Sequence, residues 1–182
     1  MVEPMRLIIG ASSQFYPGWI QTQQEELDLV LRSDWEKFAP IGGVQAILAE
    51  HVWEHLSPED ALVAARNCFE FLVPGGYVRC AVPDGLFPNP DYQRLVQVGG
   101  PGSVDHPAAG HKIVYDYRTL TAVFRAAGFE VHLLEWWNEE GTFSTHPWDE
   151  RDGFIYRSAR FDHRNQSGVL GFTSLIIDAI KP

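Results

Sequence analysis

The chain has 182 residues, of which 45% are hydrophobic and 21% charged, a balance typical of a single soluble globular domain. Its formal net charge of −10 argues against unspecific binding to nucleic acids or membranes, because both polyanions would repel it. Cys68 and Cys80 lie inside apolar runs, which favours buried, reduced thiols and a cytoplasmic protein over a disulfide framework. The sequence shows no signal peptide and no apolar run of membrane-spanning length.

Apolar runs bounded by turn residues predict a series of buried strands. In chain order, the predicted strands cover residues 6–10, 19–23, 27–31, 44–49, 77–82, 130–136 and 170–180. Gly10, which follows the run RLII, ends the first of them. Most of the predicted strands therefore lie before residue 83, and the last two lie in the C-terminal third of the chain.

Helical periodicity and capping residues predict helices between the later strands. Ser57 is a good N-cap, Pro58 suits the first helical position, and Asp60 completes a capping box, so a helix should begin here and end before Pro74-Gly75-Gly76. A second helix should cover residues 117–127, and a helical turn residues 34–38. Strands alternating with helices predict an α/β fold with a mostly parallel sheet.

Two segments interrupt this alternation within a single predicted domain of residues 1–182. Residues 84–115 and 138–168 are rich in Pro, Gly and polar side chains, and we interpret both as insertions. We expect residues 83–110 to form a long loop. Ligands of such sheets bind outside the carboxyl ends of the strands, which here indicates the positions after Ile9, Ala49 and Val82.

The order of these motifs resembles the small-molecule class I S-adenosylmethionine-dependent methyltransferases, whose fourth strand runs into an E-H-x-x-E-H segment. The resemblance covers residues 6–136 and is most specific at residues 50–56 (EHVWEHL) and 72–84 (LVPGGYVRCAVPD). It implies a Rossmann-like, doubly wound α/β fold with an antiparallel last strand. It also implies a trimmed fold, because the chain starts almost at its first strand and only a short loop joins the first two strands. The site would then be open, or covered by a partner subunit or a second copy.

In that family, a glycine-rich turn after the first strand lets the backbone approach the methionine part of the cofactor. Gly10 matches the first glycine, and Ala11 and Ser12 stand where further small residues are expected. An acidic residue that ends the second strand accepts hydrogen bonds from the ribose. Gln23 occupies that position here, and Glu25 or Glu26 could substitute.

The resemblance also implies contacts to the rest of the cofactor. Asp34 and Trp35 match the acidic and apolar pair that holds adenine, although a helix N-cap followed by a core Trp is an equal interpretation. Glu50 would contact the cofactor next to the transferable methyl group. His51 or His55 could then accept a proton from the acceptor, because the pKa of an unperturbed imidazole is close to working pH. We expect at least one of these histidines to be structural.

The segment His51-Val52-Trp53-Glu54-His55 also has the H-x-x-E-H spacing of a family of zinc proteases. That chemistry needs two His side chains on one helical face and a third ligand downstream. Here the motif lies between a strand and the cap at Ser57, and the sequence shows no evident third ligand. We therefore expect no stoichiometric zinc.

Asp84, at the end of the fifth expected strand, and the later His106, His111 and Tyr115 could bound an acceptor pocket. Turn formation is the alternative interpretation for Asp84. Arg151, Arg157, Arg160 and Arg164 could form a small anion site, although a solvated basic patch is the simpler reading. The leading hypothesis is methyl transfer from S-adenosylmethionine to a small molecule, and the alternative is a non-catalytic, methyltransferase-like domain that binds a ligand or partner.

Overall fold

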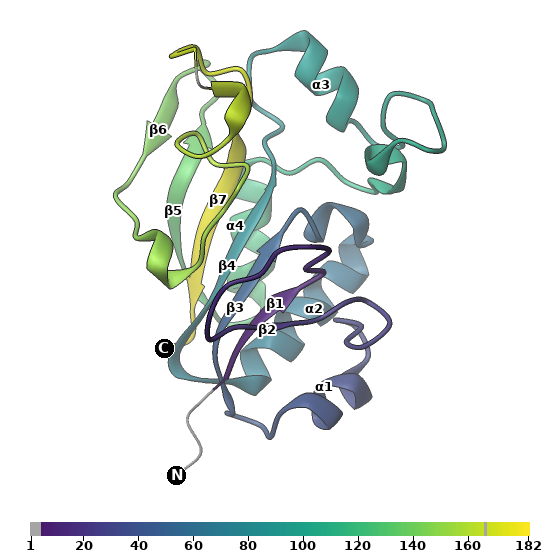
Figure 1. Ribbon diagram of the computed structural model, residues 1–182, viewed down its shortest axis with the longest axis vertical. Coiled ribbons are helices and arrows are strands. Elements are labelled where there is room, and N and C mark those ends of the chain that lie inside the picture. Colours follow the sequence, from purple (N-terminus) through teal and green to yellow (C-terminus); the bar gives the residue numbers. More distant parts are fainter. Residues whose placement is uncertain (1–4, 166) are drawn as a thin grey trace.

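The computed structural model describes residues 5–165 and 167–182, which build one seven-stranded sheet with its longer helices on one side (Figure 1). The strands lie in the order β2-β1-β3-β4-β7-β5-β6. In chain order the strands and α-helices are β1 (Met5–Ile9), β2 (Ile20–Gln21), α1 (Arg32–Phe38), β3 (Val44–Glu50), α2 (Pro58–Phe71), β4 (Leu72–Pro83), α3 (Pro90–Val96), α4 (Tyr117–Ala126), β5 (Glu130–Trp137), β6 (Phe143–Thr145) and β7 (Ser174–Ile180). Short 3₁₀ turns lie at η1 (Trp53–His55), η2 (Pro107–Gly110), η3 (Glu150–Asp152) and η4 (His163–Asn165).

The sheet is parallel in its first half and antiparallel in its second. β1 pairs in parallel with β2 and β3, and β3 with β4, so the strands beginning near Arg6, Val44 and Tyr77 are adjacent and parallel as predicted. β7 lies antiparallel between β4 and β5, and this confirms the antiparallel last strand. The predicted Rossmann-like fold class is therefore confirmed.

The strand predicted at residues 27–31 was wrong, because this segment forms turns instead. Local side-chain hydrogen bonds explain the difference: Asp28 Oδ1 accepts from the Val30 amide at 3.0 Å, and Asp34 Oδ2 accepts from the Asp28 amide at 3.2 Å. Such local bonds occupy backbone groups that a strand would need for its ladder. β2 is also shorter than residues 19–23.

The long loop expected at residues 83–110 was wrong in part, since it contains helix α3 and the turn η2. Asn89 caps α3 by accepting from the amides of Asp91 and Tyr92, and Pro90 occupies the first turn. The high Pro and Gly content of the region concealed this short capped helix. The other predicted helices were confirmed to within a few residues, including the Ser57 cap of α2, which accepts from the Asp60 amide at 3.1 Å.

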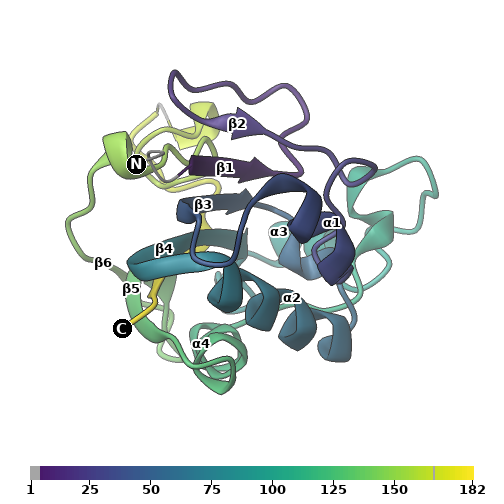
Figure 2. The ribbon, with the colours of Figure 1, turned by 90° about the horizontal axis from the view of Figure 1, so that it is seen from below.

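The two faces of the sheet are covered differently, as Figure 2 shows from below. α2 and α4 lie on one face and bury side chains such as Phe71 and Phe124 against alternate residues of the strands. The opposite face is covered by two segments, residues 10–19 and residues 146–161. We call residues 146–161 the covering segment. Trp19 and Ile155 pack there against Ile8, Leu48 and Ile176.

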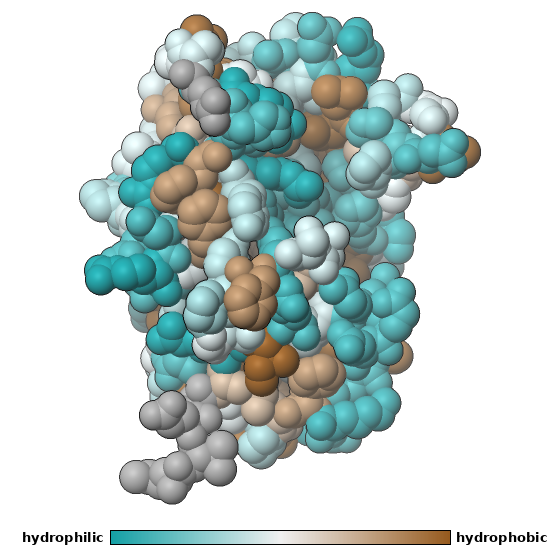
Figure 3. Space-filling model, viewed as in Figure 1, coloured by the Kyte–Doolittle hydropathy of each residue, from teal (hydrophilic) through white to brown (hydrophobic). Residues whose placement is uncertain are grey.

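The surface, the helix lengths and the cysteines can be compared with what the composition predicted. On the face shown in Figure 3, hydrophobic groups form small patches separated by hydrophilic ones. Across residues 5–165 and 167–182, no helix has the length and apolar character needed to cross a membrane. Cys68 and Cys80 are buried and unpaired, as expected.

Candidate functional site

Two adjoining cavities lie at the carboxyl ends of β1 and β3. The first, of about 320 Å³, is lined by Ile9, Gly10, Gln24, Leu27, Asp28, Leu29, Val30, His51, Val52, His55, Leu56, Asp60 and Lys112. The second, of about 470 Å³, is lined by Gly10, Ala11, Ser12, Ser13, Gln14, Glu50, His51, Tyr156 and Arg157. Gly10 and His51 belong to both cavities, so the pair forms an elongated site around the end of β1.

The turn after β1 is tight and leaves no room for a larger residue at Gly10. Gly10 has φ +59°, and a Cβ placed on it would lie 3.1 Å from Cγ2 of Val52. Ser12 also adopts a left-handed conformation, with φ 49°. The turn therefore presents Gly10, Ala11 and Ser12, the residues predicted to contact the cofactor, at the wall of the second cavity.

Gln23 lies beside this turn and binds it. Its Nε2 donates to the Ser12 carbonyl at 3.0 Å, and its Oε1 accepts from the Ser12 amide at 3.2 Å. Gln23 lines neither cavity, and both ends of its side-chain amide are engaged within the protein. The Glu26 carboxylate in turn accepts from the backbone N–H of Gln23 at 2.8 Å.

Glu50 ends β3 and is almost fully buried. Its Oε2 accepts from Gln14 Nε2 at 2.7 Å and from the Tyr156 amide at 3.0 Å, and its Oε1 accepts from the Arg157 amide at 2.9 Å. The carboxylate thus ties the covering segment to the turn after β1. It borders the second cavity but is already satisfied by protein donors.

Asp34 and Trp35 lie on α1, away from both cavities. Trp35 is fully buried, stacks on Phe71, and donates from Nε1 to the Leu29 carbonyl at 3.1 Å. Asp34 pairs with Lys37 and supports the turn at Asp28, and these bonds hold the pKa of Asp34 below its usual range. The residues of this region that do line a cavity are Asp28, Leu29 and Val30.

His51 and Glu54 form a close pair on the turn that follows β3. His51 has φ 58°, which bends the chain sharply at the end of the strand. Its Nε2 lies 2.9 Å from Ser174 Oγ, and its Nδ1 lies 3.2 Å from Glu54 Oε1. Burial alone would raise the pKa of the Glu54 carboxyl, but the neighbouring His51 and His55 lower it overall.

The four residues predicted to bound an acceptor pocket are not brought together in one cavity. His111 packs edge-on against His55, with ring centroids 4.9 Å apart. His106 caps η2 by accepting from the Ala108 amide at 3.1 Å. Asp84 is fully buried and binds backbone: it accepts from the amides of Leu86 at 2.9 Å and Trp137 at 2.8 Å. Burial raises the pKa of Asp84 to about 6.

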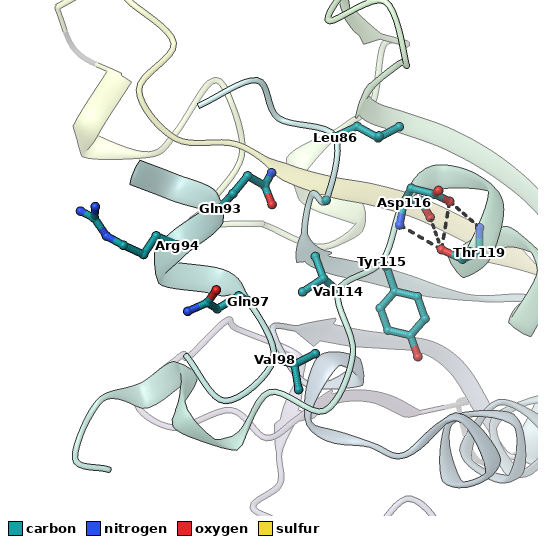
Figure 4. Close-up of a pocket in the computed structure, with 10 residues that line it drawn as sticks. Leu86, Gln93, Arg94, Gln97, Val98, Val114, Tyr115, Asp116 and Thr119 are labelled. Atoms are coloured by element: carbon teal, nitrogen blue, oxygen red, sulfur yellow. Dashed lines mark hydrogen bonds between the residues drawn. The ribbon is translucent and has the colours of Figure 1, made fainter. Parts of the chain in front are cut away.

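Tyr115 borders a separate cavity of about 570 Å³ between α3 and the start of α4 (Figure 4). Gln93 and Arg94 of α3 and Gln97, which follows the helix, line this cavity, whereas the Tyr115 ring points away from Leu86 and Gln93. The ring is buried in the core, and its hydroxyl has no hydrogen-bond partner among the described residues. The Tyr115 hydroxyl therefore points into the core and not into this open cavity.

Sequence reasoning missed Asp28 and Tyr156 as cavity residues. Asp28 was hidden by the strand prediction, although an acidic residue between apolar neighbours at the expected sheet edge could have drawn attention. Of the four arginines considered as an anion site, Arg151, Arg160 and Arg164 pair with Asp149, Glu150 and Asp162. Arg157 is the one of the four that lines the second cavity.

No protein-family model and no curated protein sequence matches this chain. Solved structures match its fold. A methyltransferase dependent on S-adenosylmethionine from Archaeoglobus fulgidus superposes with a TM-score of 0.55 at 14% identity, covering 97% of this chain and 86% of its own. A Thermotoga maritima enzyme described as a possible histamine N-methyltransferase gives 0.54 at 13%, covering 100% and 84%.

A third match is the Haloferax volcanii methyltransferase solved in complex with the Trm112 methyltransferase activator. It gives a TM-score of 0.53 at 10% identity and covers 99% of this chain and 83% of its own. The chain therefore has the fold of the class I methyltransferases. At sequence identities of 10–14%, the similarity to these structures shows the fold alone.

Proposed function

We propose that this protein transfers the methyl group of S-adenosylmethionine to a small-molecule acceptor. The observation that carries the proposal is the pair of cavities that meet at Gly10, at the carboxyl ends of two adjacent parallel strands in a methyltransferase fold. Ligands of open α/β sheets bind in this position. An elongated cofactor with a ring at one end and an amino acid at the other fits two connected cavities.

The lining residues suit the two ends of that cofactor. The amino acid end belongs in the second cavity, where Ser12 and Ser13 line the wall and Arg157 offers a cation for a carboxylate. The adenine belongs in the first cavity, between Leu27, Leu29 and the Asp28 carboxylate. This assignment replaces Asp34 and Trp35, because Trp35 is packed into the core.

The cofactor, when bound, supplies an activated methyl group, so the protein mainly has to position the acceptor and manage its proton. His51 is the better placed of the two histidines for the proton, because it alone lines both cavities. Glu54, 3.2 Å from its Nδ1, orients the ring and favours the imidazolium that forms. His55 lines only the first cavity.

One observation favours the alternative, a non-catalytic domain that binds a ligand or a partner. The Gln23 amide and the Glu50 carboxylate, which would meet the cofactor, are satisfied by Ser12, Gln14 and the covering segment. A ligand must displace these bonds or do without them. Under this alternative a partner subunit would cover the site; the Haloferax volcanii protein was solved in complex with an activator.

Calorimetric titration separates the two functions. The parent protein should bind S-adenosylmethionine and its demethylated product, and Arg157→Gln should weaken both by about 10-fold through loss of a charge-assisted bond. Arg66→Gln, which removes an equal charge from the exposed surface of α2, is the matched control and should bind as the parent does. A parent that binds neither compound at millimolar concentration would rule out the enzyme.

A further inference from the structure

A cluster of side chains beside the first cavity has no role in the cofactor assignment. Glu54 and His55 of η1 and His111 of the 84–115 segment each offer one ligand atom, and these atoms lie within 4.8 Å of one another. The sequence showed two members of this set, and the lack of an evident third ligand was the reason to expect no zinc. The fold supplies it, because His111 returns to the turn from more than fifty positions away along the chain.

Glu54 is the unusual member of this cluster. Its side chain is fully buried, yet neither of its oxygens has a hydrogen-bond partner among the described residues. A buried carboxylate without donors is costly, and native proteins pair such groups with a charge or a metal ion. His51 Nδ1 is the closest cation candidate, at 3.2 Å from Oε1, but it leaves Oε2 without any partner.

His111 is held in the form that binds metal ions. Its Nδ1 lies 2.8 Å from the Val96 carbonyl, which can only accept, so Nδ1 carries the proton. Its Nε2 then has a free lone pair, and this atom lies 3.9 Å from Glu54 Oε1. Metal-binding histidines commonly donate their other ring nitrogen to a backbone carbonyl in this way.

The backbone holds the two segments together. The Glu54 carbonyl accepts from the Lys112 amide at 2.7 Å, which fixes residue 111 beside η1. Gly110 packs directly on the His55 ring, since a Cβ at that position would lie 2.8 Å from His55 Nδ1. His55 is partly exposed and lines the first cavity, so the cluster is reachable from solvent.

We propose that Glu54, His55 and His111 bind one divalent transition-metal ion next to the first cavity. Two imidazoles and one carboxylate are a ligand set used for zinc and for iron(II), with a position left open for a further ligand. In a tetrahedral site with bonds of ~2.0–2.1 Å, neighbouring ligand atoms lie ~3.4 Å apart, so small side-chain rotations close the present spacing. The site does not require bound S-adenosylmethionine, although Glu54 also lies 3.2 Å from His51 Nδ1 and His55 lines the cavity assigned to adenine.

Metal analysis of the untagged, full-length protein tests the site. After expression in medium supplemented with zinc and iron and exhaustive dialysis, the parent should retain about one metal ion per chain, and the element found distinguishes zinc from iron(II). His111→Ala and Glu54→Gln should weaken zinc binding by at least ~100-fold, more than loss of an outer partner does. His132→Ala, which removes an exposed histidine of β5, is the matched control and should bind zinc as the parent does.

X-ray absorption of the zinc-loaded parent keeps the test decisive if a variant fails to fold. The expected spectrum shows two imidazoles and oxygen ligands at ~2.0–2.1 Å, whereas a sulfur at ~2.3 Å would assign the metal to Cys80 instead and overturn the ligand set. A parent that binds neither zinc nor iron(II) would overturn the proposed site. Variants that retain the parent's affinity would equally refute the site.

Discussion

The two faces of the sheet are covered by different kinds of structure and held by different forces. On the helical face, α2 and α4 satisfy their own backbone hydrogen bonds and contribute apolar side chains such as Phe124, which packs on Trp53 and Phe129. On the other face, the covering segment is largely irregular, so its backbone groups need partners from elsewhere. Polar side chains of the sheet provide them.

Three buried charged residues anchor the covering segment. Arg79 donates from Nη1 to the carbonyls of Asp149 at 2.7 Å and Gly153 at 2.8 Å, while its other nitrogens pair with Asp178. Glu50 accepts from the amides of residues 156 and 157, and Glu135 accepts from the Ala159 amide at 2.7 Å and from Trp148 Nε1 at 3.0 Å. A face without long helices therefore carries charge inside the fold.

The largest effect is expected from the helical face. Phe124→Ala should lower the free energy of unfolding by about 3–5 kcal/mol, because it leaves a cavity at the centre of the main core. Urea unfolding measures this free energy. Hydrogen exchange should show reduced protection over the whole sheet. A loss of protection restricted to α4 would mean that the two faces are less tightly coupled than the shared strands indicate.

Arg79→Met should cost about 3 kcal/mol, because the partly buried Asp178 carboxylate and two carbonyls lose their donor. In contrast to Phe124→Ala, the loss of exchange protection should concentrate in residues 149–157. Limited proteolysis should cut this stretch first. Arg118→Met, which removes an exposed arginine of α4, is the control and should leave the covering segment protected. Uniform destabilisation by Arg79→Met would contradict local anchoring.

Glu135→Gln should give the smallest effect, visible in the pH dependence of stability. Burial raises the folded-state pKa of Glu135 above its ordinary 4.5, so the contribution of this group to stability is complete below that pH and is lost as the pH rises through the folded value. The stability of the variant should fall less than that of the parent across this window. Asp84 titrates in both proteins, so the difference curve isolates Glu135. Parallel curves would place the Glu135 pKa at its ordinary value.

The sequence predicted the parallel strands and the capped helices, because these depend on local patterns. The apolar run of β3, which is buried along most of its length, and the Ser57 cap of α2 are each set by a few consecutive residues. The anchoring of residues 146–161 was not predictable, since Arg79 meets carbonyls seventy positions or more away. The third member of the Glu54 cluster was missed for the same reason: His111 reaches it only through tertiary structure.

The Glu50 carboxylate has a consequence for binding. It belongs at once to the wall of the second cavity and to the attachment of residues 156–157. A ligand that donates a hydrogen bond to Glu50 competes with this attachment. Its apparent affinity is therefore the intrinsic affinity multiplied by the fraction of molecules in which residues 156–157 are detached from Glu50. A ligand that leaves Glu50 alone and contacts Arg157 has the opposite thermodynamic linkage: it binds the closed form and suppresses local opening.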